Sequence, residues 1–175
     1  IYAAGLALMV VSPDGTTLSL TAGVLTGVGI ATSSFSIVMA AFGIPVMEKS
    51  DPALLEVQAL ALVPTRELAL QVAEELTGLG RGRGLKVVTI YGGDPIERQL
   101  DALRAGVHVV VGTPGRVLDH LRRGTLSLKA CRTLVLDEAD RMLDMGFAVE
   151  MAQIMEFVPA ERQTLLFSAT VPLGI

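Results

Sequence analysis

The chain of 175 residues is long enough for one domain with a substantial core, and its single cysteine, Cys131, excludes an internal disulfide. A net charge of −4 gives no bulk electrostatic attraction to nucleic acid, so any such contact has to come from a local arrangement of groups. The chain also contains no Trp and only 4% aromatic residues, which argues against extended base-stacking surfaces.

Charge is distributed unevenly along the sequence. Asp14 is the only charged side chain between Ile1 and Met47, and all 14 Lys and Arg residues follow from Lys49 onward. The mean hydropathy of +0.56 is therefore an average over an apolar segment and a segment of ordinary polarity. We expect two units, an apolar one at residues 1–39 and a second one at residues 40–175.

The apolar unit is long enough to cross a membrane. Residues 18–47 carry no charged side chain, whereas a membrane-spanning helix needs only ~20 such residues. Gly23 and Gly27 have the small-residue spacing that lets such helices pack closely. We expect residues 18–38 to form a helix or helix pair, and residues 1–39 to associate with a membrane. A glycine-rich helix or strand pair buried in a soluble core is the alternative.

From Glu48 onward, short apolar runs alternate with amphipathic stretches. The runs expected to form buried strands are residues 57–63, 85–91, 107–111, 133–136 and 164–167. Helices are expected from Arg66 to residue 79, from an N-cap at Asp94 to residue 104, and after Asp140. This alternation predicts an α/β fold with a parallel sheet flanked by helices, in which ligands bind beyond the carboxyl ends of the strands.

A distinctive string of residues follows each expected strand. Each string alone has an ordinary explanation as a turn or a helix cap, but five in this order, each at a strand end, are hard to obtain by chance. In chain order they are Pro64-Thr65-Arg66-Glu67-Leu68, Gly92-Gly93, Gly112-Thr113-Pro114-Gly115-Arg116, Asp137-Glu138-Ala139-Asp140 and Ser168-Ala169-Thr170.

Taken together, these strings resemble the DEAD-box family of ATP-dependent RNA helicases. The resemblance covers residues 40–175 and implies the first of two RecA-like domains. It also implies ATP hydrolysis coupled to RNA strand separation, with ATP and Mg²⁺ as cofactors, RNA as partner and a cytoplasmic location. Residues 22–31 and 34–38 resemble a helix pair of a major facilitator transporter.

The helicase resemblance assigns roles to the residues of the strings. Asp137 is expected to hold Mg²⁺ through water, and Glu138 to orient or deprotonate the attacking water, so that both lie at the ATP site. Ser168 and Thr170 are expected to link hydrolysis to strand separation. The residues expected to contact the RNA backbone are Thr65, Arg66, Gly93, Thr113, Gly115 and Arg116. Each group also has a simpler alternative role. Asp137 and Glu138 could form a solvated acidic turn, and Ser168 and Thr170 could cap a helix. Arg66 could pair with Glu67 or Glu74.

One part of the family pattern is missing. The family places Gly-Lys-Thr immediately before Ala40, but Ile37, Val38 and Met39 stand there, so that valine replaces the phosphate-binding lysine and methionine replaces the Mg²⁺-binding hydroxyl. The second RecA-like domain is not part of the sequence either. We therefore expect a truncated or chimeric chain, joined near residue 40 by natural fusion or by sequence assembly, that is inactive alone. The alternatives are a non-hydrolysing module that binds RNA or a partner, and a transporter fragment with a cytoplasmic appendage.

Overall fold

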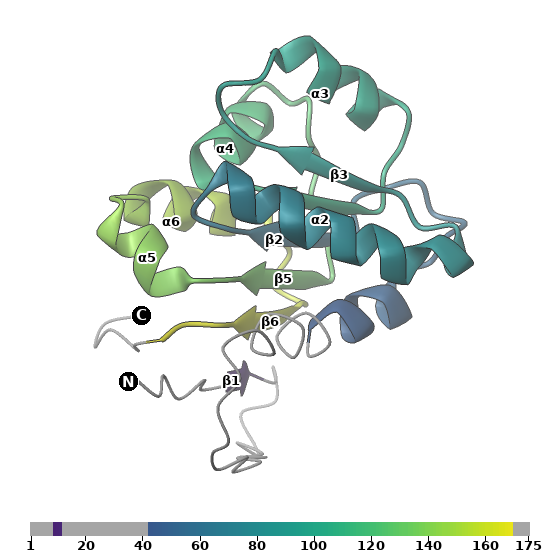
Figure 1. The fold of residues 1–175 in the computed structure, drawn as a ribbon, viewed down its shortest axis with the longest axis horizontal. Helices are drawn as coiled ribbons and strands as arrows, with labels where there is room; N and C mark the ends of the chain where they lie inside the picture. Colours follow the sequence, from purple (N-terminus) through teal and green to yellow (C-terminus); the bar gives the residue numbers. More distant parts are fainter. Residues whose placement is uncertain (1–8, 12–41, 170–175) are drawn as a thin grey trace.

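The computed structural model describes residues 9–11 and 42–169. Within these residues, six strands form one sheet in the order β1-β6-β5-β2-β4-β3 (Figure 1). All neighbouring strands are parallel except β1, which runs antiparallel to β6. The strands are β1 (Met9–Val11), β2 (Ala59–Leu62), β3 (Val87–Ile90), β4 (Val109–Gly112), β5 (Thr133–Leu136) and β6 (Gln163–Leu166).

Helices cover the sheet on opposite sides, and α2 lies in front of it in Figure 1. Because successive side chains of a strand point to opposite faces, Ala59 and Ala61 of β2 join the core under α2, while Leu60 and Leu62 join the core under α4 and α6. A parallel sheet buried on both faces is expected to be apolar throughout, as β2 and β4 are. The helices are α2 (Arg66–Gly80), α3 (Ile96–Arg104), α4 (Pro114–Arg122), α5 (Ala139–Asp144) and α6 (Ala148–Phe157), with a 3₁₀ turn at Arg81–Arg83.

Residues 42–49 are also helical and pack on the α2 side of the sheet. The ring of Phe42 lies against the ring of Phe167, with centroids 5.5 Å apart and the planes tilted by 53°. Both phenylalanines are fully buried. Aromatic pairs of this geometry contribute about 0.5–1.5 kcal/mol beyond the burial of their area. This contact fixes the helix at 42–49 against the chain that leaves β6.

The expected α/β architecture is confirmed, because all five expected strands form and are mutually parallel. The expectation for Asp94 is wrong: α3 begins at Ile96 with Pro95 as its cap, so the helix starts later than the Asp-Pro string suggested. Proline fixes φ but has no side-chain acceptor for the first-turn N–H groups.

The expected helical, membrane-like character of residues 1–39 is wrong at Met9–Val11. These residues form β1, in register with Leu166, Leu165 and Thr164 of β6. Residues 18–38, with Val38, Met39 and the expected junction near residue 40, lie outside the described residues. No helix within residues 42–169 is both long and apolar enough to span a bilayer.

Candidate functional site

The predicted site residues lie along one edge of the sheet, at the carboxyl ends of its parallel strands. Their order follows the strand order β6-β5-β2-β4-β3. The ends of β6 and β5 carry Ser168, Asp137 and Glu138, whereas those of β2, β4 and β3 carry Thr65, Arg66, Thr113, Gly115, Arg116 and Gly93. The residues expected to act on ATP thus occupy one part of the edge and those expected to contact RNA the other. Thr170 lies outside the described residues.

Asp137 is a buried carboxylate at the tip of β5. Its backbone N–H donates to the carbonyl of Leu62 over 3.0 Å, which ties the tips of β5 and β2 together. The side chain is only 7% exposed. Burial, reinforced by the charge of Glu138, raises the pKa of Asp137 to about 6, although its Oδ1 accepts a hydrogen bond from the Glu138 N–H. A carboxylate in this environment is stabilised by any cation that reaches it.

Glu138 has a strained backbone. Its φ of 52° and ψ of 49° lie in the left-handed region, and it is the one non-glycine residue with positive φ in the described part of the chain. Such a conformation costs about 1–3 kcal/mol and persists where the surrounding structure enforces it. Here the next N–H, that of Ala139, donates to the carbonyl of Phe167 over 3.1 Å. The Glu138 side chain is partly exposed, and its Oε2 pairs with Arg141 at 3.1 Å.

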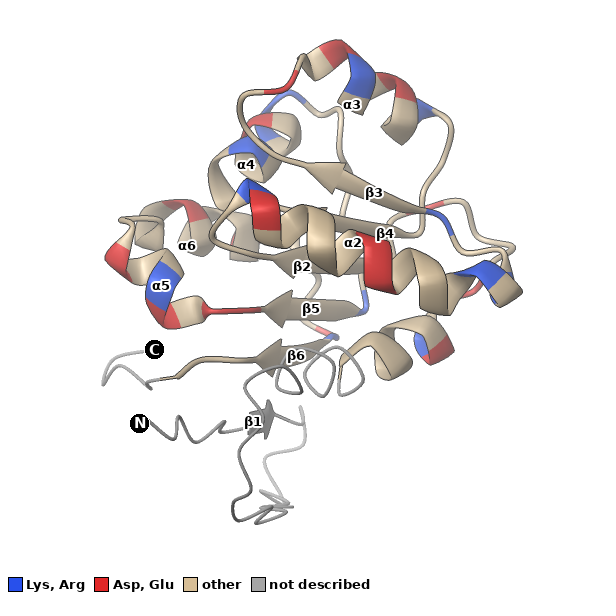
Figure 2. Ribbon diagram, viewed as in Figure 1, with Lys and Arg blue, Asp and Glu red and all other residues tan. Residues whose placement is uncertain are grey.

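Ser168 connects the tip of β6 to the start of α5. It is 6% exposed, and its Oγ accepts a hydrogen bond from the backbone N–H of Asp140 over 3.2 Å. Figure 2 shows the acidic segment at the tip of β5 leading directly into α5. This bond therefore couples the tip of β6 to the position of the acidic loop.

Thr65 and Arg66 open α2 at the tip of β2. The Thr65 hydroxyl oxygen accepts from the N–H of Leu68 over 3.3 Å, which caps the helix and leaves the O–H hydrogen as a donor. The guanidinium of Arg66 lies 4.8 Å from the centre of the Tyr91 ring. Pairing with Glu67 or Glu74 is not observed, since none of the ion pairs within residues 42–169 includes Arg66.

Glycines shape the loops after β3 and β4 for different reasons. Gly93 has a φ of +82° in the turn after β3, a conformation that favours glycine, and the space around it is open. Gly115 also faces open space. Gly112, by contrast, ends β4 where an added Cβ would lie 2.5 Å from the Ile90 carbonyl oxygen and 2.6 Å from Val117 Cγ2. The first two glycines leave room for an external group, while Gly112 allows close packing of β3, β4 and α4.

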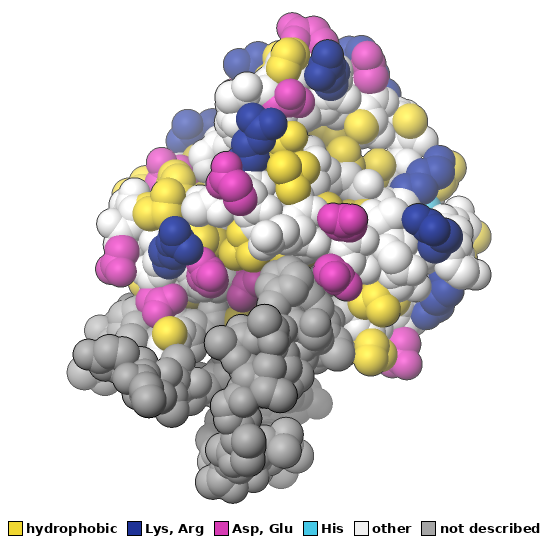
Figure 3. Space-filling view, in the orientation of Figure 1, with side chains coloured by type: hydrophobic (Ala, Val, Ile, Leu, Met, Phe, Trp, Pro, Cys, Tyr) yellow, Lys and Arg dark blue, Asp and Glu magenta, His cyan; other side chains and the backbone are white. Residues whose placement is uncertain are grey.

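The loop after β4 presents Arg116 in the first turn of α4. Thr113 caps this helix without a side-chain hydrogen bond, and Pro114 occupies the first turn, where a missing N–H costs nothing. Arg116 Nη1 donates to the carbonyl oxygen of Asp94 over 3.1 Å and to Oε1 of Gln99 over 3.5 Å. Basic and acidic side chains are interspersed over the face in Figure 3, so no extended basic surface is visible there.

Sequence reasoning assigned no role to Tyr91, Gln99 or His120. Tyr91 and Gln99 each contact a predicted site residue, and His120 contacts Gln99. Gln99 and His120 are buried polar side chains that hydrogen-bond to each other. A usable indication was present for Gln99, which lies on the stripe of α3 that also contains Ile96 and Leu103. A polar residue at a core position of an amphipathic helix predicts a specific buried partner.

The residues at the β5 tip fit a divalent cation that is held only in part by protein. No cluster of three or more His, Cys, Asp or Glu side chains suited to a metal occurs within residues 42–169. Asp137 is one buried carboxylate whose pKa is raised, so an approaching cation would offset its desolvation. Mg²⁺ is commonly bound through one or two carboxylates, several waters and substrate phosphates. The donor set therefore suits a metal that arrives with a phosphorylated ligand.

Comparisons with known proteins connect these loops to one family. The DEAD-box ATP-dependent RNA helicase CshA of Geobacillus kaustophilus is 58% identical over 133 residues, which is 76% of this chain and 28% of that protein. The protein of the same name from Bacillus licheniformis is 54% identical over 136 residues, covering 78% of this chain and 28% of its own length. The crystal structure of a DEAD box protein from the hyperthermophile Methanococcus jannaschii matches with a TM-score of 0.73 and 46% identity, covering 77% of this chain and 36% of that one.

These matches do not support the expectations for the apolar unit. The family model for DEAD/DEAH box helicases begins at residue 40, and nothing in these comparisons supports a transporter-like segment or membrane association at residues 1–39. The transporter-fragment alternative, and a module outside the helicase family that only binds RNA or a partner, are therefore not favoured. The model matches residues 40–174, which is more than half of the 175 residues, and the chain accordingly belongs to the DEAD/DEAH box helicase family.

Proposed function

We propose that residues 40–175 form the ATP-binding and RNA-binding first RecA-like domain of an ATP-dependent RNA helicase. The observation that carries this proposal is the order of side chains along the carboxyl edge of the sheet. Acidic and hydroxyl groups gather at β5 and β6, while arginines, threonines and glycines gather at β2, β3 and β4. One domain can therefore hold a nucleotide and an RNA strand side by side on the same edge.

At the nucleotide, the proposed roles follow from the environments of two adjacent carboxyl groups. Asp137 is buried and would hold Mg²⁺, which neutralises phosphate charge when bound. Glu138 is exposed enough to reach a water molecule and would orient or deprotonate it. Arg141 pairs with Glu138 over 3.1 Å and holds its carboxylate beside the tip of β5. Ser168 would transmit changes at this loop to the chain beyond β6.

At the RNA, the proposed contacts are made to the phosphate backbone. Thr65, Thr113, Arg66 and Arg116 supply hydroxyl and guanidinium donors, while Gly93 and Gly115 let phosphates approach the backbone amides. Contacts of this type carry little sequence information. Binding should therefore be similar for RNAs of different sequence and should weaken steeply with salt.

We also propose that this chain does not hydrolyse ATP as its sequence stands. Val38 and Met39 occupy the positions where the family has the phosphate-binding lysine and the Mg²⁺-binding hydroxyl. Catalysis of phosphoryl transfer depends mainly on positioning and on positive groups around the transferring phosphoryl. Asp137 and Glu138 alone do not provide that charge.

The test compares ATP turnover by the unmodified chain with turnover by a version that has a complete phosphate loop before Ala40. Both assays contain RNA and a second RecA-like domain of the family supplied in trans. We expect turnover only in the repaired version, and loss of that turnover in its Glu138→Gln variant. Turnover by the unmodified chain that Glu138→Gln abolishes would disprove the proposed defect. A repaired, folded version that neither binds RNA nor hydrolyses ATP would contradict the proposed function itself.

A further inference from the structure

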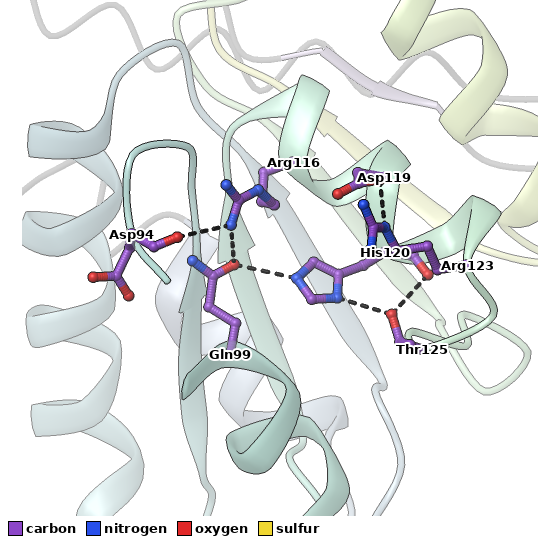
Figure 4. Close-up of polar contacts among 7 residues, drawn as sticks. All are labelled: Asp94, Gln99, Arg116, Asp119, His120, Arg123 and Thr125. Carbon is purple, nitrogen blue, oxygen red and sulfur yellow. Dashed lines mark hydrogen bonds and ion pairs between the residues drawn. The ribbon is translucent and has the colours of Figure 1, made fainter. Parts of the chain in front are cut away.

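A buried network of polar side chains joins α3 to α4 behind the proposed RNA-binding loops (Figure 4). Gln99 lies at its centre. Its Nε2 donates to the carbonyl oxygen of Tyr91 over 3.0 Å, and its Oε1 lies 3.2 Å from Nε2 of His120 and 3.5 Å from Nη1 of Arg116. Gln99 is 4% exposed and His120 is fully buried, so the contacts of Gln99 with Tyr91 and His120 are shielded from water, whereas its contact with Arg116 is partly buried.

The partners of Gln99 fix the direction of its amide. Tyr91 offers a carbonyl oxygen, which accepts only, so the NH₂ group has to face it. Arg116 offers N–H groups, which donate only, so the amide oxygen has to face Arg116. The ring of His120 then presents Nε2–H to the same oxygen. Burial, with the charge of Arg116 beside it, lowers the pKa of His120 and favours the neutral ring, whose Nδ1 faces the Thr125 hydroxyl at 2.9 Å.

Arg116 differs from Arg104, Arg123 and Arg141 in the kind of acceptor that holds it, and in this respect resembles Arg122, which donates to the amide oxygen of Gln153. Arg123 lies 2.7 Å from a carboxylate oxygen of Asp119, and Arg104 and Arg141 are also paired with carboxylates. Arg116 takes part in no ion pair within residues 42–169, and its two acceptors, the Asp94 carbonyl and the Gln99 amide, are uncharged. Its direction is thus set while its charge is left for an external anion.

The same amide also controls the loop after β3. Tyr91, whose carbonyl accepts from Gln99, directly precedes Gly92 and Gly93, and its ring lies beneath Arg66. Gln99 therefore acts together with the direct bond from Arg116 to the Asp94 carbonyl in setting the relative positions of a guanidinium from the β4 loop and a glycine turn from the β3 loop. A single RNA strand that runs across both loops meets phosphate-binding groups at a fixed separation only if this connection holds.

We propose that Gln99 is a positioning residue for RNA binding, which holds Arg116 and the Gly92–Gly93 turn in register without contacting RNA itself. This inference rests on the proposed function, because it concerns the same RNA-binding loops. It predicts that an uncharged acceptor is needed at position 99. A carboxylate there would pair with Arg116 and cancel the charge that the neutral amide leaves available.

The test uses the full chain and a fluorescein-labelled single-stranded RNA of mixed sequence, with the dissociation constant measured across a salt series. Gln99→Glu should weaken binding about tenfold and reduce the slope of log affinity against log salt by about 1, as for one lost phosphate contact. Arg123→Gln is the matched control, because it removes from α4 an arginine whose charge is already paired. It should leave both quantities close to those of the unmodified chain.

A double-mutant cycle distinguishes positioning from a general loss of structure. Arg116→Gln should weaken binding as much as Gln99→Glu, and the double variant should bind no more weakly than either single one. Gln99→Leu, checked by circular dichroism, provides a second variant in case Gln99→Glu does not fold. Gln99→Leu should bind RNA more weakly, because the Arg116 guanidinium loses its orientation. Its slope of log affinity against log salt should stay unchanged, because the guanidinium keeps its charge.

Three results would overturn the inference, and one of them also bears on the proposed function. Unchanged affinity and salt slope in Gln99→Glu, with a clear loss in Arg116→Gln, would reject the role of Gln99 alone. Additive losses in the double variant would show that Gln99 acts independently of Arg116. Absence of RNA binding by the unmodified, folded chain would reject the RNA-binding function and this inference with it.

Discussion

The guanidinium carbon of Arg66 lies 4.8 Å from the centroid of the Tyr91 ring, so the first residue of α2 rests on the residue that follows β3. Helix α2 follows β2, and β2 and β3 are not neighbours in the sheet, because β4 lies between them. The contact therefore spans the β4 tip and holds the guanidinium over the proposed RNA-binding edge.

Replacement of Tyr91 should show how much its contact with Arg66 contributes to RNA affinity. Tyr91→Leu removes the ring and should weaken RNA binding about two- to fivefold, as expected for a cation–π interaction of about 0.5–1 kcal/mol at an exposed site. Tyr91→Phe keeps the ring face and should bind like the unmodified chain. Fluorescence anisotropy with labelled RNA measures both. Equal affinities in the Leu and Phe variants would show that the ring does not support RNA binding.

Asp137→Asn should stabilise the fold at neutral pH. The pKa of Asp137 is raised from 3.8 to about 6, so the folded chain retains a proton that the unfolded chain releases between these values, and stability falls as pH rises through that window. The neutral amide avoids this cost and preserves an acceptor for the Glu138 N–H. Urea unfolding should show a gain of about 1–3 kcal/mol at pH 7 and almost none at pH 3.5. The same gain at both pH values would exclude burial of the charge as its cause.

Glu138→Gly should also stabilise the chain while removing the proposed base. The left-handed backbone of Glu138, with φ of 52°, is accessible to glycine without strain, so relief of about 1 kcal/mol is expected. Loss of the exposed pair with Arg141 offsets little of this gain. Glu138→Gln is the control, because it removes the charge and keeps the strain. A lower free energy of unfolding in the Gly variant than in the Gln variant would count against strain at this residue.

Gly112→Ala should destabilise the chain by about 1–3 kcal/mol, since an overpacked contact forces backbone or side chains to move. The added Cβ would lie 2.5 Å from a backbone oxygen of Ile90, which cannot swing aside as a flexible side chain can. Gly78→Ala in α2 is the control, because nothing lies within 4 Å of its added Cβ and alanine favours a helix by up to about 1 kcal/mol. Chemical unfolding measures the free energy of unfolding of both variants. An unchanged free energy of unfolding in Gly112→Ala would show that β3 and β4 can separate at their tips.

The parts of the fold that depend on local pattern were predictable from the sequence. Each parallel strand was expected within a few residues of its observed position, because its apolar run is bounded by turn residues. The positions of the described site residues followed from the same reasoning, since carboxyl ends of parallel strands share an edge. The functional roles assigned to Asp137, Glu138, Arg66 and Arg116 remain predictions.

Features that join distant segments were not predictable in this way. The pairing of Met9–Val11 with β6 depends on which sheet edge is available, and nothing in a short apolar run specifies that edge. The bond between Gln99 and His120 joins two helices whose relative position is set by the whole sheet. A buried glutamine indicates that a partner exists, but only the packed structure identifies it.

The place of β2 in the sheet has a consequence for synthesis of the chain. β2 pairs with β4 on one side and β5 on the other, and both are translated after it. Its first partner begins at Val109, about 50 residues later, which corresponds to roughly 3–10 seconds at ordinary rates of translation. During that interval β2 has no partner strand, and Leu60 and Leu62, which are fully buried in the folded protein, lack the helices α4 and α6 that cover them. Among the parallel strands, β2 therefore has the longest interval between its own synthesis and the synthesis of its first partner. This makes Ala59–Leu62 a candidate binding segment for chaperones that hold nascent apolar chains.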